Sequence, residues 1–330
     1  MSTQYPDSKT ILTALALAIR APSVHNSQPW RWRVGPQSLH LYSDPDLHLP
    51  NTDPDRRDLM LSCGASLNHC VIALAALGWQ PKVQRFPNPV DPHHLAAIEL
   101  TRRGPAELDI ALAAAIPRRR TDRRIYSSWP VPRGDIALMG SRAARAGVKL
   151  LRVEDMTGFN DVVKQAVRTH THDDEYLREL TEWSGRHGSL AGVPARNIPT
   201  PDPAAELPGR LFAGAALAQP ADATPAADNA IVLALGTRDD DELARLRAGE
   251  ATSLVLLTAT ALGLSSCPIT EPLEIEQTRE AVRRDVFDSN EFPQMLLRVG
   301  WALANADPLP STPRRALSDV VARLDGSAFA

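Results

Sequence analysis

The amino-acid sequence predicts an α+β fold in which a mixed sheet carries helices on both faces, and three observations support this prediction. Segments with helical periodicity alternate with short apolar runs typical of buried strands along the 330 residues. Two long segments repeat each other, which predicts two pseudo-symmetric halves. Hydrophobic residues make up 43% and charged residues 23% of the chain, values that are typical of a globular protein and exclude a fibrous or disordered one.

The repeat consists of residues 64–79 and 249–264, each of which begins with glycine and ends with Leu-Gly and an apolar residue. A charged stretch precedes each segment, and an apolar run typical of a buried strand follows each. Helix–strand units also recur by chance, but two elements in the same order with the same internal length favour a duplication. We therefore expect an N-terminal half, residues 1–110, and a C-terminal half, residues 111–330.

Each half has a predicted order of elements. In the N-terminal half, apolar periodicity and Pro/Gly punctuation predict helices over 9–20 and 56–77 and strands over 30–34, 39–42, 82–86 and 95–102. In the C-terminal half, they predict helices ending near 116 and covering 132–146, 158–169, 174–184, 249–264 and 276–284, with strands at 149–153, 231–235, 265–268 and 295–302. Residues 185–228 are rich in Pro, Gly and Ala with little periodicity. Such a long excursion is usually a lid, a binding element or a disordered insert.

The charge balance and the cysteines narrow the class of protein. A formal net charge of −3 gives no overall attraction to nucleic acid or acidic membranes. The apolar runs are shorter than the roughly 20 residues that span a bilayer, and residues 1–9 do not resemble a signal peptide. Three cysteines, none in a Cys-x-x-Cys pair, argue against a disulfide framework, so we expect a cytoplasmic protein. The glycine-rich dinucleotide motif, the P-loop, the nucleophile elbow and the His-Glu-x-x-His motif are missing from the sequence.

Residues 20–33, RAPSVHNSQPWRWR, form the first segment that could carry chemistry. Pro22 imposes a non-helical path, and Ser23, Asn26 and Gln28 place hydrogen-bond donors and acceptors on it. A loop of this kind can hold the edge of a planar polar ligand. The simpler alternative is a helix C-terminal turn capped by Ser and Asn.

Residues 117–126, PRRRTDRRIY, hold five arginines within seven positions, beside the hydroxyl of Thr121. Arginine binds phosphate through paired hydrogen bonds, and a hydroxyl can complete the cradle. A solvated basic surface or a nucleic-acid patch is the alternative, but the acidic balance and the lack of interleaved aromatic residues count against nucleic acid. We therefore favour a small ligand that carries a phosphate. Arg314 and Arg315 provide a second possible phosphate contact.

Two further segments were weighed for chemistry. Residues 263–271, GLSSCPITE, combine small residues with proline and so let backbone N–H groups approach a flat ring. Cys267 fits a buried small residue better than a nucleophile, because no His or Asp partner is near it in the sequence. Residues 170–174, HTHDD, with His93 and His94, suggest a metal site, but their spacing and the missing fourth ligand favour solvated side chains, so we predict no metal.

Taken together, these segments resemble the motifs of FMN-dependent nitroreductases. Residues 21–30 are similar to the family's APSxxNxQPW loop, and residues 119–123, RRTDR, to its opening Arg-Arg-Ser-x-Arg motif. Residues 263–269 resemble the flavin-facing segment, and residues 313–315, PRR, resemble the C-terminal phosphate contact. The order departs from that of the usual homodimeric members, because the loop lies in one half and the arginine motif in the other. The chain looks like such a dimer fused into one polypeptide with one flavin site retained, which is similar to the dormancy-associated Acg-type branch.

The resemblance implies a nitroreductase-like fold and a set of cofactor-binding residues. It implies that the FMN phosphate is held by Arg119, Arg120, Thr121 and Arg123, together with Arg314 or Arg315. It implies that the flavin is lined by Pro22, Ser23 and Asn26, with Gln28 in support, and that the backbone around Pro268, Ile269, Thr270 and Glu271 faces the ring. The resemblance implies no side-chain acid or base, so no catalytic residue is assigned.

The resemblance also implies an activity. We expect an oxidoreductase that takes hydride from NAD(P)H through FMN and passes electrons to a nitroaromatic, a quinone or a similar acceptor. The alternative is a catalytically silent protein that stores or sequesters FMN, with residues 185–228 covering the flavin as a lid. A module that binds nucleic acid or another macromolecule is the weakest of the three interpretations. Because fusion replaces the second subunit, we expect a monomer.

Overall fold

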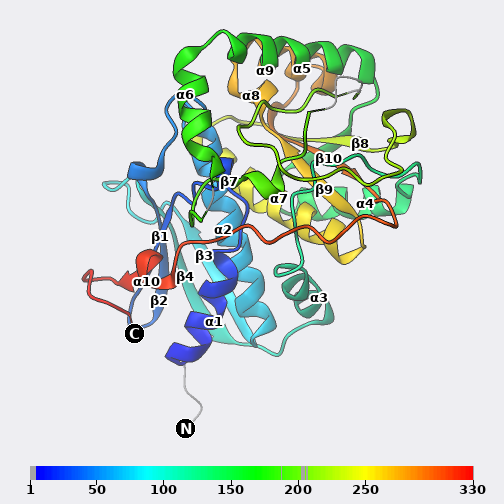
Figure 1. Ribbon diagram of the computed structural model, residues 1–330. Helices are drawn as coiled ribbons and strands as arrows, with labels where there is room; N and C mark the ends of the chain where they lie inside the picture. Colours follow the sequence, from blue (N-terminus) through cyan, green and yellow to red (C-terminus); the bar gives the residue numbers. More distant parts are fainter. Residues whose placement is uncertain (1–4, 187, 202–204, 206, 330) are drawn as a thin grey trace.

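The computed structural model describes residues 5–186, 188–201, 205 and 207–329 and shows one main sheet in each half of the chain (Figure 1). The N-terminal half contains α1 (Ser8–Ala18), β1 (Trp30–Val34), β2 (Ser38–Ser43), α2 (Arg57–Ala76), β3 (Trp79–Arg85) and β4 (His94–Arg102). Helix α3 (Glu107–Ala115) spans the expected boundary between the halves at residue 110. The C-terminal half contains α4 (Arg133–Arg145), β5 (Lys149–Arg152), α5 (Met156–Thr171), α6 (Asp174–Trp183), β6 (Ser184–Arg186), β7 (Val193–Pro194), β8 (Ile231–Thr237), α7 (Glu242–Ala261), β9 (Ser265–Ile269), α8 (Glu271–Glu274), α9 (Glu276–Phe287), β10 (Phe292–Gly300), α10 (Leu317–Val320) and β11 (Val321–Arg323).

The two sheets share one topology. The first has the order β1-β2-β4-β3 and the second the order β5-β8-β10-β9, and every neighbouring pair within these runs is antiparallel. In both sheets, the first two strands precede a long helix along the chain and the last two strands follow it. Strand β11 extends the first sheet by pairing in parallel with β1, opposite Trp32. The end of the C-terminal half thus lies in the sheet of the N-terminal half.

The repeat helices α2 and α7 cross at their glycines. A Cβ atom on Gly64 would lie 2.1 Å from the carbonyl oxygen of Leu246, and one on Gly249 would lie 2.2 Å from that of Leu61. Four residues beyond each glycine, Ser253 donates a hydrogen bond of 2.8 Å to the Asn68 side chain. Glycine lets two helix backbones approach where any side chain would clash. The crossing thus relates matching positions of the two repeats, which agrees with a duplication.

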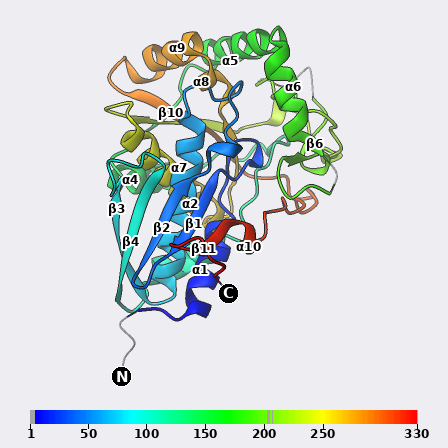
Figure 2. The same ribbon diagram turned by 90° about the vertical axis from the view of Figure 1, so that its left-hand side faces the viewer.

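The two sheets differ in how their faces are covered. In the second sheet, alternate residues of β8 pack in opposite directions, with Leu233 against α4 and α7 and Val232 against α5 and α9. In the first sheet, Leu39 and Leu41 of β2 pack into the core formed with α1 and α2. The opposite face, toward the viewer in Figure 2, carries partly exposed polar side chains. Only the second sheet has helices packed on both of its faces in the described residues.

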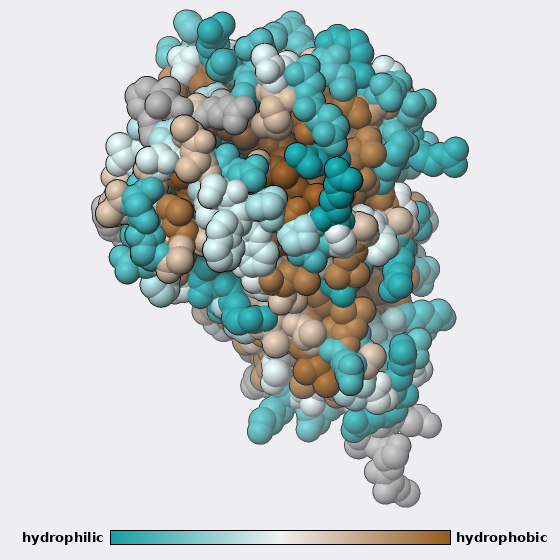
Figure 3. Space-filling model, turned by 90° about the vertical axis from the view of Figure 1, so that its right-hand side faces the viewer, coloured by the Kyte–Doolittle hydropathy of each residue, from teal (hydrophilic) through white to brown (hydrophobic). Residues whose placement is uncertain are grey.

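Helix α2 is long and apolar enough to cross a membrane by length and composition, but its most apolar window is 78% buried inside the protein. It packs against α1 and α7 and is therefore a core helix. At the surface, single apolar side chains such as Trp129 and Ile110 are exposed. Figure 3 shows one face on which apolar side chains gather in the middle, between polar margins.

The predicted elements occur with small changes of boundary, with three differences. Helix α7 begins at Glu242, ahead of the predicted residue 249, because the Asp241 side chain accepts a hydrogen bond of 2.7 Å from the N–H of Ala244 and caps the helix. Helix α8 and strand β11 were not predicted, since both are very short and β11 pairs with a strand almost 300 residues away. The excursion, residues 185–228, contains only short strands and single helical turns in its described part.

Candidate functional site

A cavity of about 470 Å³ lies where the two halves meet. The loop after α1 and the first turns of α2 line it from the N-terminal half. The arginine run, α5 and β9 line it from the C-terminal half, together with residues 198–201, 205 and 207–212 of the excursion and with Thr312 and Arg314 near the C-terminus. Segments from both halves and from both ends of the chain therefore form one site.

The loop after α1 is held in an unusual backbone conformation. His25, Asn26 and Gln28 have positive φ angles of 44°, 56° and 56°, a region that residues other than glycine seldom adopt. The Ser62 hydroxyl of α2 accepts a hydrogen bond of 3.1 Å from the N–H of Val24. Since strained backbone persists only where its surroundings hold it, the loop is a built feature of the site.

The side chains of Asn26 and Gln28 tie this loop to distant segments. Asn26 donates to the carbonyl oxygens of Gly192 and Pro313, at 3.1 and 3.2 Å. Gln28 donates to the carbonyl of Leu190 and accepts from the N–H of Arg315, both at 2.9 Å. Hydrogen bonds thus hold the loop to the excursion and to residues 313–315 near the C-terminus.

Arg314 lines the cavity, but its guanidinium is surrounded by acceptors from the protein. It donates to the Asn26 side chain at 2.9 Å and to five backbone carbonyls, those of Ile19, Arg20, Ala21, Thr312 and Pro313. None of these acceptors carries a charge. Burial, with the neighbouring charges of Arg119 and Arg20, lowers the pKa of Arg314 to about 9.

The structure separates the arginines of the 117–126 run. Arg124 forms an ion pair of 3.0 Å with Asp122, Arg118 is exposed, and Arg120 donates to the carbonyls of Pro117 and Arg119. Arg119 and Arg123 line the cavity, and neither forms an ion pair with a carboxylate of the described residues. Only part of the run therefore presents positive charge to a ligand.

Arg119 has the least favourable surroundings of these residues. It is 7% exposed, its Nε has no hydrogen-bond partner in the described structure, and its guanidinium donates only a long hydrogen bond of 3.5 Å to the Thr121 hydroxyl among the described residues. Burial, followed by the charges of Arg120 and Arg20, lowers the pKa of Arg119 to about 10. With Arg20, Arg120 and Arg314 it forms a basic cluster that an anion would stabilise.

Strand β9 forms the opposite wall. A bridge between Thr121 and Ser266, with a hydrogen bond of 3.0 Å from the N–H of Asp122, aligns the arginine run with this strand. Residues 267–271 line the cavity. The Glu271 side chain, however, points to the His170 ring and contacts its Nδ1 at 3.0 Å.

The excursion closes a further side of the cavity through Arg210 and Phe212. The Arg210 guanidinium donates to His25 Nε2 at 2.6 Å and to the Thr270 hydroxyl at 3.0 Å, and it forms an ion pair with Glu274. The Phe212 ring lies beneath the Arg123 guanidinium, 4.9 Å from it, and edge-on to His25. The excursion is thereby bonded to both halves across the cavity.

The structure brings most of the sequence-predicted site residues to one place. The cavity is lined by Pro22, Ser23, Asn26, Arg119, Thr121, Arg123, Pro268, Ile269, Thr270, Glu271 and Arg314. Gln28, Arg120 and Arg315 lie behind its wall, and Arg315 is directed toward Asp44 at 3.6 Å. Asp58, Arg210 and Phe212 also line the cavity but were not predicted, because their partners come from distant segments.

The residues weighed as metal ligands are separate in the structure. His170 contacts Glu271, whereas the exposed His172 ring contacts the carbonyl of Arg168 at 2.7 Å. His94 is paired with His40 at 3.0 Å in the first sheet. In the described part of the chain, no group of three or more His, Cys, Asp or Glu side chains is placed to hold a metal ion.

Comparisons with known proteins were made at the level of families, sequences and folds. No family model matches the chain. It is 65% identical over 321 residues to the Mycobacterium tuberculosis protein named "Putative NAD(P)H nitroreductase Rv3131", covering 97% of this chain and 93% of that protein. It is 35% identical over 323 residues to "Putative NAD(P)H nitroreductase acg" of the same organism, covering 94% of both.

Some solved structures resemble this chain over a smaller part of its length than these two relatives do. A nitroreductase with bound FMN from Bacteroides fragilis has 15% identity and a TM-score of 0.41, covering 62% of this chain and 95% of that one. A nitroreductase with bound FMN from Desulfitobacterium hafniense has 12% identity and a TM-score of 0.40, covering 65% and 98%. The identification rests on the two relatives that match along almost the whole chain: the protein belongs to the nitroreductase family, in the same branch as Acg of Mycobacterium tuberculosis.

Proposed function

We propose that the cavity binds FMN, with the phosphate at its arginine end. The observation that carries this proposal is the basic cluster of Arg20, Arg119, Arg120 and Arg314, which includes no ion pair with a carboxylate of the described residues. A buried positive cluster is unfavourable unless an anion neutralises it, and phosphate supplies negative charge and several acceptor oxygens. The orphaned Nε of Arg119 offers one such hydrogen bond.

The rest of the cavity fits the remainder of this cofactor. Pro22, Ser23 and the backbone of Asn26 would face FMN from the N-terminal half, and the backbone of residues 268–271 from the C-terminal half. The Thr252 hydroxyl of α7 lines the cavity and has no hydrogen-bond partner in the described structure. Gln28, Arg120 and Arg315 would act from behind the wall by holding the loop and the arginine run.

We infer from this site an NAD(P)H-dependent FMN oxidoreductase that reduces a nitroaromatic, a quinone or a similar acceptor. When bound, FMN supplies the hydride and electron chemistry, while the protein supplies position and electrostatics. The names of the two relatives support this activity. We further propose that the protein acts in the cytoplasm as a monomer, because one chain provides both walls of the cavity and its three cysteines are free.

Storage of FMN without turnover is the second candidate. The observation that favours it is the bonding of the excursion to both halves, through Arg210, over the cavity. A segment held in this way would prevent the nicotinamide ring from stacking on FMN. The two candidates share the cofactor and differ in whether a second substrate reaches it.

An anaerobic absorption spectrum, recorded before and after addition of NADPH or NADH, separates the candidates. Bleaching of a bound flavin within seconds supports the reductase, whereas a spectrum that stays oxidised supports storage. A colourless protein that takes up no added FMN contradicts both.

The cofactor assignment has a separate test in the double variant Arg119→Ala/Arg123→Ala. We expect FMN affinity to fall by at least about 100-fold, since each buried charged hydrogen bond contributes about 1.5–3 kcal/mol. Calorimetric titration with FMN measures this loss. Arg145→Ala, an exposed arginine at the end of α4, is the matched control and should bind FMN as the wild type does. Unchanged binding in the double variant contradicts the proposed phosphate site.

A further inference from the structure

The first turn of α2 brings a carboxyl group into the cavity. Asp58 is 6% exposed and lines the cavity. In the described residues, no hydrogen bond or ion pair is made by its carboxyl oxygens; its backbone N–H donates to the Asp53 side chain at 3.0 Å. An ionised carboxylate that is buried without a partner is strongly unfavourable. The charge state of Asp58 is therefore decided by the groups around it.

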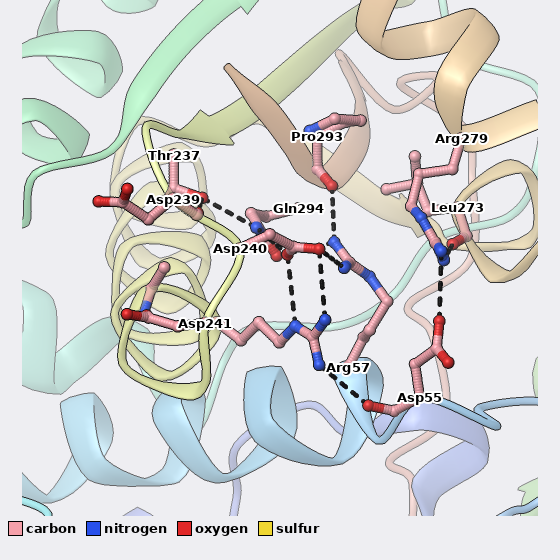
Figure 4. Close-up of polar contacts among 12 residues, drawn as sticks. Asp55, Arg57, Thr237, Asp239, Asp240, Asp241, Leu273, Arg279, Pro293 and Gln294 are labelled. Atoms are coloured by element: carbon pink, nitrogen blue, oxygen red, sulfur yellow. Dashed lines mark hydrogen bonds and ion pairs between the residues drawn. The ribbon is translucent and has the colours of Figure 1, made fainter. Parts of the chain in front are cut away.

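The nearest cation in the sequence is committed elsewhere. Figure 4 shows the Arg57 guanidinium turned toward Asp240, with which it forms an ion pair of 2.5 Å. Arg57 also donates to the carbonyl of Pro293 at 3.0 Å and to the Gln294 side chain at 3.1 Å. Arg57 therefore donates its hydrogen bonds to residues of the C-terminal half. Its charge has only a small electrostatic effect on Asp58.

The second cation, Arg210, is committed as well. Its donors go to His25, Thr270 and Glu274. The ion pair with Glu274 balances the charge of Arg210 within the pair. Asp58 thus lies near two arginines but forms an ion pair with neither of them.

The other groups that face Asp58 are acidic. Asp53, in the segment before α2, uses both carboxyl oxygens to accept from the backbone N–H groups of Asp58 and Leu59, at 3.0 and 2.8 Å. Glu274 approaches from α8. Burial and the charges of Asp53 and Glu274 raise the pKa of Asp58 well above its ordinary value, against the smaller effects of Arg210 and Arg57. Burial and the neighbouring carboxyl groups therefore favour the protonated form of Asp58 at the wall of the cavity.

A small hollow adjoins Asp58. A hollow of about 10 Å³, close to the volume that one water molecule requires, is lined by Asp53, Asp55, Asp58 and Glu274. Asp55 is exposed at the far end, where it pairs with Arg279 at 3.2 Å (Figure 4). Carboxyl groups thus lie on both sides of the hollow, between solvent and the cavity.

We propose that Asp58 is the proton donor to the electron acceptor that binds in the cavity. This inference rests on the proposed oxidoreductase function. When bound and reduced, FMN would supply a hydride to a quinone; the O–H bond of Asp58 would break as its proton forms an O–H bond with a quinone oxygen. Hydride and proton together convert the quinone into the hydroquinone, and the Asp58 carboxylate regains a proton from water.

The test compares an acceptor that needs protons with one that does not. Benzoquinone takes two electrons and two protons, whereas ferricyanide takes electrons alone. In the FMN-loaded Asp58→Asn variant, we expect benzoquinone turnover at pH 7 to fall by about 100-fold, the lower range of general acid catalysis, and ferricyanide turnover to stay within twofold. The control Asp161→Asn, at an exposed position of α5 that lines neither the cavity nor the hollow, should keep both rates.

The pH dependence and an infrared measurement complete the test. Wild-type benzoquinone turnover should decline at high pH as Asp58 loses its proton, and Asp58→Asn should abolish that decline. In infrared spectra, the carbonyl stretch of a protonated carboxylic acid at pH 7 should be present in the wild type and Asp161→Asn, and lost in Asp58→Asn. If Asp58→Asn does not fold, Asp58→Glu replaces it and should keep both the band and benzoquinone turnover.

Each failure has its own signature. A wild type that binds no FMN contradicts the proposed function itself. A wild type that binds FMN and reduces benzoquinone supports the proposed function. If Asp58→Asn then turns over benzoquinone as fast as the wild type, or loses benzoquinone and ferricyanide turnover to the same extent, only the role of Asp58 is contradicted. An Asp58 carboxyl that is ionised at pH 7 in the infrared spectrum also overturns this role.

Discussion

In the N-terminal half, residues 19–29 connect α1 to β1, whereas in the C-terminal half residues 146–148 connect the corresponding helix α4 to β5. The long connection carries Ser23 and Asn26 to the cavity wall. The short one turns directly into the strand at Gly147, whose φ angle is 78°. Two similar frameworks therefore carry different connections, and we attribute the single site of our proposal to this difference.

A second difference lies between the first two strands of each sheet. Residues 35–37 join β1 to β2, but residues 153–230 join β5 to β8 and include α5, α6 and the excursion. This insertion covers the outer face of the second sheet and closes the cavity. The comparison teaches that the shared strand order builds the framework, while the inserted segments of one half build the enclosure.

The covered face of the second sheet should be the more sensitive of the two. Phe287 of α9 is 1% exposed, and its ring lies 2.6 Å from the position of a Cβ on Gly236 in β8. Phe287→Ala should lower the free energy of unfolding by about 4 kcal/mol, because it leaves a cavity in the core. Urea denaturation measures the loss. A loss below 1 kcal/mol would show that α9 does not hold this face.

At the crossing of α2 and α7, substitution of either glycine should lower the stability of the protein by the same amount. Gly64→Ala and Gly249→Ala each place a Cβ within 2.2 Å of a carbonyl oxygen of the other helix, so each should cost about 3 kcal/mol of unfolding free energy. Thermal denaturation compares them. Gly140→Ala in α4 is the matched control, since its Cβ meets only a Leu150 side-chain atom at 3.9 Å and alanine favours helix. A large effect from one glycine alone would break the symmetry of the crossing.

The two repeat helices should also differ in their response to acid. His69 of α2 occupies the position that Leu254 occupies in α7, and burial, with the charge of Arg119, lowers its pKa to about 3. Because the unfolded chain takes up the proton first, the stability contributed by neutral His69 is present above pH 6.5 and is lost as the pH falls toward 3. The loss approaches about 1.4 kcal/mol per pH unit.

The variant His69→Leu copies the residue of the second half and should remove this loss. Urea denaturation between pH 7 and pH 4 gives the comparison with the wild type. Parallel stability curves for the two proteins would show that folding does not lower the pKa of His69.

The smallest effect is expected on the open face of the first sheet. Lys82 and Glu99 form an exposed cross-strand ion pair of 3.3 Å. Lys82→Ala should change the free energy of unfolding by less than about 0.5 kcal/mol, because water and salt screen such pairs. Urea denaturation in low salt measures this change in the free energy of unfolding. A loss as large as that from Phe287→Ala would mean that this face is covered.

Local sequence patterns were sufficient to predict most elements, and most of the site residues they predicted line the cavity. Apolar periodicity predicts α2 and the strands around it, because burial on one side requires that spacing. The loop residue Ser23 and the basic residue Arg119 were recognised because their chemistry lies in short contiguous motifs. Strand β11 was missed, since its three residues gain their pairing only from distant β1.

Reading along the chain was enough to find the repeat of residues 64–79 and 249–264, the family resemblance, the arginine run and the 20–33 loop. Only the tertiary structure decided which arginines face the cavity and which pair with carboxylates such as Asp122. It also decided that Arg210 spans the cavity and that Asp58 is left without a cation. The physical reason is that periodicity and motifs are local properties of the chain, whereas burial and charge neutralisation depend on partners that the fold brings together from remote segments.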